Sequence, residues 1–194
     1  MAETHPIRRD FTPPPRIESE ILRQAATYWL NLCPEAGFPA YARLDPVDMP
    51  RSALPCLWVV DWTGPATGFR FRLAGERIAS VFNHKVRSRF FEEAFRDSPV
   101  SLREAVRDRF CRVVDTGAIC HCAGAVYLEN GLAGAGERLI LPMAEHDRGP
   151  VRYLLGITDF VPAEQNRKSV AVPGQVRERF FPVHALPALC SRDV

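Results

Sequence analysis

The sequence has no long apolar run. None of its hydrophobic stretches approaches the ~20 consecutive residues that a membrane-spanning helix needs. Residues 1–15 are polar and rich in proline, without the apolar stretch of a secretory signal peptide. We therefore expect a cytoplasmic protein with no membrane partner. The 194 residues, 46% of them hydrophobic and 25% charged, fit one globular domain with extensions rather than a disordered chain.

Paired cysteine motifs are also missing. The six cysteines are scattered along the sequence, and in a cytoplasmic chain we expect them to be reduced thiols, most of them buried. A disulfide-stapled secreted fold is therefore excluded, and a domain of this length needs no such staple. The six cysteines, none of them in a Cys-x-x-Cys pair, are Cys33, Cys56, Cys111, Cys120, Cys122 and Cys190.

Neither sign of charge is in large excess, and lysine is scarce. With 25 basic and 23 acidic residues the net charge is +2, whereas a dedicated nucleic-acid-binding domain carries a strong basic excess. We therefore expect no nucleic-acid partner. Among the 25 basic residues only Lys85 and Lys168 are lysines. Genomic composition explains this bias, or else some arginines hold an anion or an acidic partner through their planar guanidinium groups.

Motifs for catalysis are absent as well. The sequence has neither a Gly-x-Ser-x-Gly motif nor a paired-carboxylate motif. We therefore predict that the protein is not an enzyme.

The sequence does contain a mixture of helical and strand patterns. Apolar residues at helical spacing predict an amphipathic helix over 17–33, stopped by Pro34 and Gly37. Residues 56–62 are apolar enough for a strand that is covered on both faces. Strict alternation over the next strand predicts a hairpin partner for it, with Phe69, Phe71 and Leu73 on one face and Arg70 and Arg72 on the other.

A long helix and three more strands follow. The segment Ser101–Glu104 is a capping box that predicts the start of this helix, and Gly117 predicts its end. Strands are expected over 119–129, 137–144 and 151–161. We divide the chain into a flexible lead (1–16), the N-terminal helical segment (17–37), one domain (38–162) and a C-terminal extension (163–194) that lies on the domain or on a partner.

This order of elements resembles the PAS fold. The resemblance, to a bacterial stand-alone PAS-type sensor family, covers residues 38–162. Two positions depart from the family pattern, because Glu76 stands where threonine is usual and Ser88 where glycine is usual. The segments that carry the resemblance are Arg43–Pro50, Leu54–Pro55, Phe69–Gly75, Leu139–Pro142 and Val151–Gly156.

The resemblance implies an α+β fold with a five-stranded antiparallel sheet in the order 2-1-5-4-3, with helices on one face. It also implies a signalling role, in which the domain senses a small molecule or pairs with another protein. Because the strand over 56–62 is apolar on both faces, we expect the N-terminal helix to cover the opposite face, alone or with a second subunit.

A ligand pocket is predicted from apolar and aromatic side chains on the helices and strands. Ordinary core packing is the alternative for the same residues. His84 and Arg87 lie where PAS pockets often open, and an exposed loop is the alternative there. The predicted pocket residues are Phe71, Ile78, Phe82, Leu102, Phe110, Tyr127 and Tyr153.

Two motifs invite a chemical interpretation. In the strand that contains Cys120-His121-Cys122, the two cysteines share one face and the histidine takes the other, so the three side chains cannot converge on one ion. We therefore predict no metal site. The glycine-rich run 131–136 precedes a strand rather than a helix, so we interpret it as a hairpin loop rather than a phosphate cradle.

Three functional hypotheses remain. The first is a PAS-type sensor that binds a small ligand or a signalling partner and forms a homodimer through the N-terminal helix and the sheet face. The second is a cone- or hot-dog-shaped α+β enzyme that acts on a small acid or thioester through Asp61 or His121. The third is a ligand-free dimeric adaptor whose core is filled by aromatic rings. No cofactor is identified for any of them.

Overall fold

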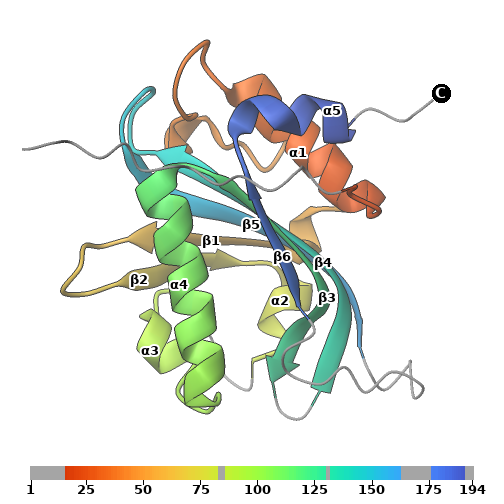
Figure 1. The fold of residues 1–194 in the computed structure, drawn as a ribbon, viewed down its shortest axis with the longest axis vertical. Helices are drawn as coiled ribbons and strands as arrows, with labels where there is room; N and C mark the ends of the chain where they lie inside the picture. The colour runs from red at the N-terminus through yellow and green to blue at the C-terminus, as the bar shows by residue number, and fades with distance from the viewer. Residues whose placement is uncertain (1–15, 83–85, 130–131, 163–175, 191–194) are drawn as a thin grey trace, which may run out of the picture.

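The computed structural model describes residues 16–82, 86–129, 132–162 and 176–190. Its centre is an antiparallel sheet of six strands in the order β2-β1-β5-β4-β3-β6, with helices packed on it (Figure 1). The α+β class and the antiparallel sheet are as predicted, but the sheet has six strands and not the predicted five. The strands are β1 (Leu57–Trp62), β2 (Phe69–Ala74), β3 (Ile119–Glu129), β4 (Leu132–Ala144), β5 (Val151–Pro162) and β6 (Arg177–Phe181).

In the described part of the chain, five helices and three short 3-10 turns surround the sheet. Within the described residues no helix is both long and apolar enough to cross a membrane. The helices are α1 (Glu20–Leu32), α2 (Glu76–Ala79), α3 (Phe91–Ala94), α4 (Val100–Thr116) and α5 (Leu186–Cys190), and the turns are η1 (Tyr41–Arg43), η2 (Leu54–Cys56) and η4 (Val183–Ala185).

The sixth strand comes from the C-terminal extension. β6 pairs with residues 119–123 of β3, and the segment that follows it places α5 against α1 (Figure 1). Because side chains alternate along a strand, Phe180 and Phe181 are buried on opposite faces of the sheet. The described part of the extension is therefore built into the fold, and the two adjacent phenylalanines are the residues that fix it.

Each face of the sheet carries its own hydrophobic core. β1 contributes Trp58 and Val60 to the core beneath α2, α3 and α4, which we name the helix-side core. It contributes Leu57 and Val59 to the core beneath α1 and α5, which we name the α1-side core. The buried apolar strand thus separates two cores, as its composition predicts.

α1 begins and ends at capping residues. The Ser19 hydroxyl accepts a hydrogen bond from the Leu22 N–H at 3.3 Å, so the helix begins after Ser19 and not at residue 17. Its buried side chains, among them Leu22 and Trp29, face the sheet. The helix ends at Cys33, just before Pro34.

A β-bulge changes the face of one predicted residue. Val60 pairs with Phe71, whereas Val59 pairs with Leu73, so Arg72 is the extra residue in β2. Phe71 therefore faces the helix-side core, but Leu73 packs against the α1-side core. The prediction that Leu73 shares a face with Phe71 is wrong, because strict alternation assumes an unbroken ladder.

The long helix α4 begins one residue before the predicted capping box. The Pro99 carbonyl accepts the N–H groups of Leu102 and Arg103, so Val100 is already helical and Ser101 lies inside the first turn. The predicted role of Ser101 as the cap is therefore wrong. Gly117 does end the helix in the left-handed conformation, with φ +64°.

Candidate functional site

The structure brings most of the predicted pocket residues to one place. Phe71, Ile78, Phe82 and Phe110 are buried in the helix-side core, and Leu102 and Tyr127 are half-buried against it. Their contact with a ligand stays a prediction.

Tyr153 lies on the opposite face of the sheet. It belongs to the α1-side core and stacks on Tyr41 with ring centroids 4.6 Å apart. Its neighbour Leu154 faces the helix side, and adjacent strand residues point to opposite faces. Tyr153 therefore cannot line a cavity with the other six residues.

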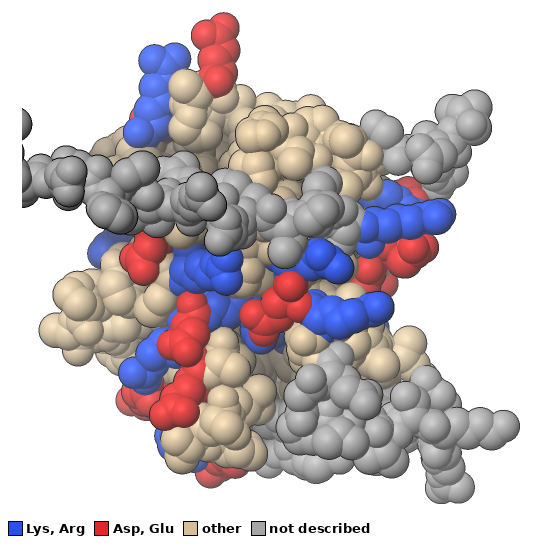
Figure 2. All heavy atoms as spheres, in the orientation of Figure 1, with Lys and Arg blue, Asp and Glu red and all other residues tan. Residues whose placement is uncertain are grey.

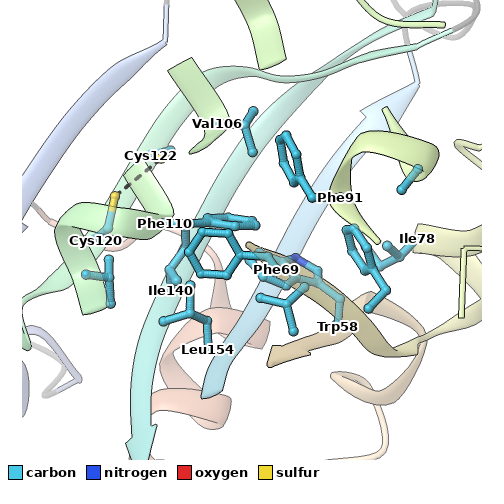
Figure 3. Packing of buried hydrophobic residues seen from close by; sticks show 14 of the residues in the cluster. Trp58, Phe69, Ile78, Phe91, Val106, Phe110, Cys120, Cys122, Ile140 and Leu154 are labelled. Atoms are coloured by element: carbon cyan, nitrogen blue, oxygen red, sulfur yellow. Dashed lines mark hydrogen bonds between the residues drawn. The ribbon is translucent and has the colours of Figure 1, made fainter. Parts of the chain in front are cut away.

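Aromatic rings fill the helix-side core (Figure 3). Phe110 of α4 packs against Trp58 and Phe69 with ring centroids 5.3 and 5.2 Å away, and Phe91 stacks on Phe95 at 4.5 Å. These are the offset and edge-to-face distances at which aromatic pairs stabilise a core.

Two open cavities lie elsewhere on the described surface. One, of about 350 Å³, runs along the exposed side of α1 and reaches Cys190 of α5. The other, of about 320 Å³, lies where the N-terminus of α1 meets β3, β4 and β5, and it is lined by Ser19 and Glu137. Neither is lined by any of the seven predicted pocket residues.

A pair of thiols lies in the helix-side core, on β3. The Sγ atoms of Cys120 and Cys122 are 3.7 Å apart, and both side chains are fully buried (Figure 3). His121 points to the other face, as the alternation predicts. Among the described residues no group of three or more histidines, cysteines and carboxylates is placed to hold a metal ion.

Two buried arginines flank these thiols. Arg109 of α4 and Arg138 of β4 are 6% and 7% exposed. The Arg109 guanidinium pairs with Glu178 of β6, with Nε 3.0 Å from Oε1, and Arg138 lies directly across the ladder from Cys122. We name Cys120, Cys122, Arg109, Arg138, Glu178 and Thr158 the thiol–arginine cluster.

The pKa values of the two thiols move in opposite directions. A hydrogen bond from Cys120 lowers the pKa of Cys122 to about 7; burial opposes this, and the positive charges of Arg109 and Arg138 support it. Burial raises the pKa of Cys120 well above its ordinary value. Cys122 is therefore the thiol that ionises first.

Thr158 joins the cluster to the aromatic core. Its hydroxyl oxygen accepts hydrogen bonds from Trp58 Nε1 and from Arg138 Nε, both at 3.0 Å. Thr158 is fully buried on β5. The Trp58 indole and the Arg138 guanidinium thus donate hydrogen bonds to the same oxygen atom, so a shift of either group perturbs the hydrogen bond of the other.

On the α1 side, His121 is joined to the start of α1 through a carboxylate. His121 Nε2 lies 3.1 Å from Glu137 Oε1, and the Glu137 carboxylate accepts the backbone N–H of Ser19 at 2.6 Å. The Ser19 hydroxyl also donates to Asp159 at 2.8 Å. Burial raises the pKa of Glu137, but hydrogen bonds from His121, Ser19 and Glu18 outweigh it and lower the pKa.

Arg70 and Arg72, which alternation places together on one face of their strand, pair with a buried carboxylate of the same chain. Asp61, 3% exposed, accepts a hydrogen bond from Arg70 at 2.8 Å, and Arg72 lies 3.6 Å away. Asp61 faces Tyr153 across the β1–β5 ladder. Both residues that the enzyme hypothesis names, Asp61 and His121, are therefore outside the helix-side core.

The remaining candidates are placed as follows. His84 and Gly131 lie outside the described residues, and Arg87 is exposed. The glycine-rich run from Leu132 to Gly136 is part of β4 and not a loop. A Cβ at Gly136 would come within 2.0 Å of the Asp159 carbonyl oxygen, so glycine here allows close strand pairing.

The charged members of the thiol–arginine cluster are not among the residues predicted from the sequence. A signal for them was present, because Arg138 occupies an inward position two residues before Ile140, and Arg109 interrupts the apolar stripe of α4 between Val106 and Phe110. A charge at a core-facing position marks either a bulge or a buried polar network.

On the molecular face in Figure 2, basic and acidic side chains are interspersed.

A protein-family model identifies the family of this chain. The family model described as PAS domain matches residues 17–158, so this chain belongs to the PAS domain family. No curated protein matches it. A solved structure titled "Structure of an RNA-binding Light-Oxygen-Voltage Receptor" is similar, with a TM-score of 0.42 and 19% identity over 70% of this chain and 39% of that one. This chain thus spans about two fifths of that receptor chain.

Proposed function

We propose that this PAS domain is a sensor that receives its signal in the helix-side core and passes it through the central strands to α1 and a partner protein. One observation carries the proposal. β3 presents Cys120 and Cys122 to the helix-side core and His121, between them, to the carboxylate that holds the start of α1.

The first route between the two faces runs along β3 and β4. A displacement of Cys122 moves the backbone of His121, and the His121 ring bonds Glu137. The Glu137 carboxylate in turn accepts a hydrogen bond from the N–H of Ser19, and Ser19 is the residue that caps α1. Packed strands transmit small shifts because cores are close-packed and deform little.

A second route runs from α2. Ile78 of α2 is buried in the helix-side core, and its neighbour Arg77 places Nη1 3.2 Å from Asp159 Oδ1. The other carboxylate oxygen of Asp159 accepts the Ser19 hydroxyl. Both routes therefore end at the cap of α1.

The surface that we propose for binding a protein partner is the exposed side of α1. The α1-side face of the sheet is already covered by α1 and α5, whereas Gln24, Thr27 and Asn31 line the open cavity along α1. We propose that a second copy of the chain, or a signalling protein, binds there. Native mass spectrometry tests the homodimer. Thr27→Arg should weaken it, whereas the control Arg96→Ala, an exposed position just after α3, should not.

The filled aromatic core favours the adaptor hypothesis as the second candidate, in which partner binding replaces ligand binding. The described cysteines are all free thiols, which supports a reducing, cytoplasmic location as part of the proposal.

Hydrogen–deuterium exchange of the full chain tests the transmission. Arg138→Met removes the guanidinium from the cluster but keeps its length, and we expect faster exchange of the α1 amides over 20–32. The control is Arg103→Met on the partly exposed side of α4, which should leave α1 unchanged. Equal α1 exchange in both variants would contradict the proposal.

A further inference from the structure

We propose that Cys120 and Cys122 are a peroxide-reactive dithiol, in which Cys122 is the attacking sulfur and Cys120 the resolving sulfur, and that their oxidation is the signal of this sensor. The inference rests on the proposed function, because it names the signal that the helix-side core receives. The two Sγ atoms are already 3.7 Å apart.

A disulfide between these residues requires β3 to bend locally at His121. Same-face Cβ atoms of residues i and i+2 in an extended strand are about as far apart as their Cα atoms, whereas a disulfide needs Cβ atoms roughly 3.5–4.5 Å apart. Residues i and i+2 of a strand have Cα atoms roughly 6.6 Å apart, and disulfides span Cα separations of up to about 6.8 Å. The Cα separation is thus near the upper limit, and the bond forms only with a local distortion of β3, which strains it. Strained disulfides are readily reduced, and such labile bonds suit reversible regulation.

The charges around Cys122 favour a thiolate. Arg109 has a carboxylate partner in Glu178, but in the described part of the chain no carboxylate lies within ion-pair distance of Arg138. Its described hydrogen bonds go to the neutral Thr158 hydroxyl and Val126 carbonyl. A buried cation is costly without a counter-charge, and a Cys122 thiolate, opposite Arg138 on the ladder, supplies one.

The two sulfurs are inequivalent in the way that the reaction requires. The pKa of Cys122 is lowered to about 7 by the hydrogen bond from Cys120 and by both arginines, whereas burial raises the pKa of Cys120. The charged and titratable groups that face Cys122 are Cys120 on its own strand, Arg109 on α4, Arg138 on β4 and Glu178 on β6. A thiolate with a protonated thiol neighbour is the arrangement of an attacking and a resolving cysteine.

The reaction balances with a hydroperoxide as the oxidant. The Cys122 thiolate attacks the terminal oxygen, an S–O bond forms, the O–O bond breaks, and the leaving oxygen takes a proton to depart as water or alcohol. Cys120 then attacks the sulfenic sulfur; the S–S bond forms, and the hydroxide that leaves takes the Cys120 proton to become water. Two thiols are oxidised by two electrons and one peroxide is reduced.

Hydrogen peroxide has a short path to the thiols at the edge of the sheet. β3 is next to the edge strand β6, where Glu178 lies across the ladder from Cys122 and pairs with Arg109. The Glu178 side chain is 32% exposed, while Arg109 is buried beneath it. Local opening of this ion pair admits a molecule of that size. Glu178 also raises the pKa of Cys122. Glu178→Gln should therefore speed the reaction for two reasons: the ion pair with Arg109 is lost, and more of Cys122 is ionised.

Peroxide titration of the purified full chain, read by mass spectrometry of peptides, tests the proposal. We expect a Cys120–Cys122 disulfide to form before the half-buried Cys111 reacts. Cys122→Ser should abolish it, Cys120→Ser should leave a sulfenic acid that dimedone traps, and Cys111→Ser should change nothing. Arg138→Met removes one of the two positive charges that lower the pKa of Cys122, so the rate at pH 7 should fall by roughly two- to fivefold, because only the thiolate reacts.

The outcomes separate this inference from the proposed function. If Cys120 and Cys122 stay reduced while Cys111 oxidises, the dithiol proposal is wrong, and faster α1 exchange in Arg138→Met still supports transmission. If the disulfide forms and α1 exchange is unchanged by it, the dithiol is peroxide-reactive but does not signal, which overturns the link that we infer.

Discussion

His121 Nε2 lies 3.1 Å from Glu137 Oε1, on the face of the sheet opposite to the two cysteines that flank His121 in the sequence. One strand therefore connects a buried dithiol with the residue that fixes the start of α1. Neither of the two open cavities on the described surface is lined by the predicted pocket residues, and we place the signal chemistry of the domain in side chains that the chain itself supplies.

Acidification should release the start of α1. The pKa of Glu137 is lower in the folded protein than its ordinary value of 4.5, so its contribution to stability is present above that value and is lost as the pH falls through the folded pKa. We expect the free energy of unfolding, measured in urea, to drop between roughly pH 5 and pH 3, a window that extends further below the ordinary value of 4.5 than above it because the folded pKa is lowered, more steeply in the native protein than in Glu137→Gln. Parallel curves for the two proteins would contradict the assignment.

Cys122 gives a pH dependence at higher pH. Its folded pKa, about 7, is below its ordinary value of 9.0, so the unfolded chain binds more protons between these values and stability rises with pH there. Under reducing conditions, Cys122→Ser should flatten this rise in the unfolding free energy, and Cys111→Ser should not. An unchanged slope in Cys122→Ser would argue against a Cys122 thiolate.

Gly156 should tolerate no side chain while Trp58 is present. A Cβ at this position would lie 1.9 Å from Trp58 Cε2. Gly156→Ala should therefore cost about 2–4 kcal/mol in unfolding free energy. In the background Trp58→Leu the same change should cost far less, because the ring is gone. Additive losses in the double variant would show that the indole is not the obstacle.

The C-terminal extension should contribute directly to stability. Phe181 of β6 is fully buried in the α1-side core, so Phe181→Ala should destabilise the protein by about 3–5 kcal/mol. Arg179→Ala, two residues earlier and exposed, serves as the control and should change the unfolding free energy by less than about 0.5 kcal/mol. Similar values for both would mean that β6 is only loosely attached.

The elements with a strong local pattern were predictable from sequence. The alternation around Cys120 and Cys122 gave the correct common face for the thiols, and Gly117 gave the end of α4. What was missed depends on pairing between distant segments. The bulge at Arg72 moves Leu73 to the other face, and β6 forms only because β3 offers an edge.

The site was predicted only in part for the same reason. Phe110 and its aromatic neighbours follow from burial alone, but Arg109 and Arg138 meet Cys122 only after α4 and β4 have packed against β3. Tyr153 was grouped with residues of the other face, because β5 is buried on both faces over residues 153–158 and its pattern there does not show which way each residue is turned.

The central claim is that β3 couples the helix-side core to the cap of α1, and a double-mutant cycle tests it most directly. Cys122→Ser and Ser19→Ala, alone and together, are measured by native-state hydrogen exchange of the α1 amides. Loss of the cap alone should cost about 1 kcal/mol. We predict that the two changes depart from additivity by about 0.5 kcal/mol or more, and that Glu137→Gln removes this difference. Additivity within about 0.3 kcal/mol in the native background would contradict the account.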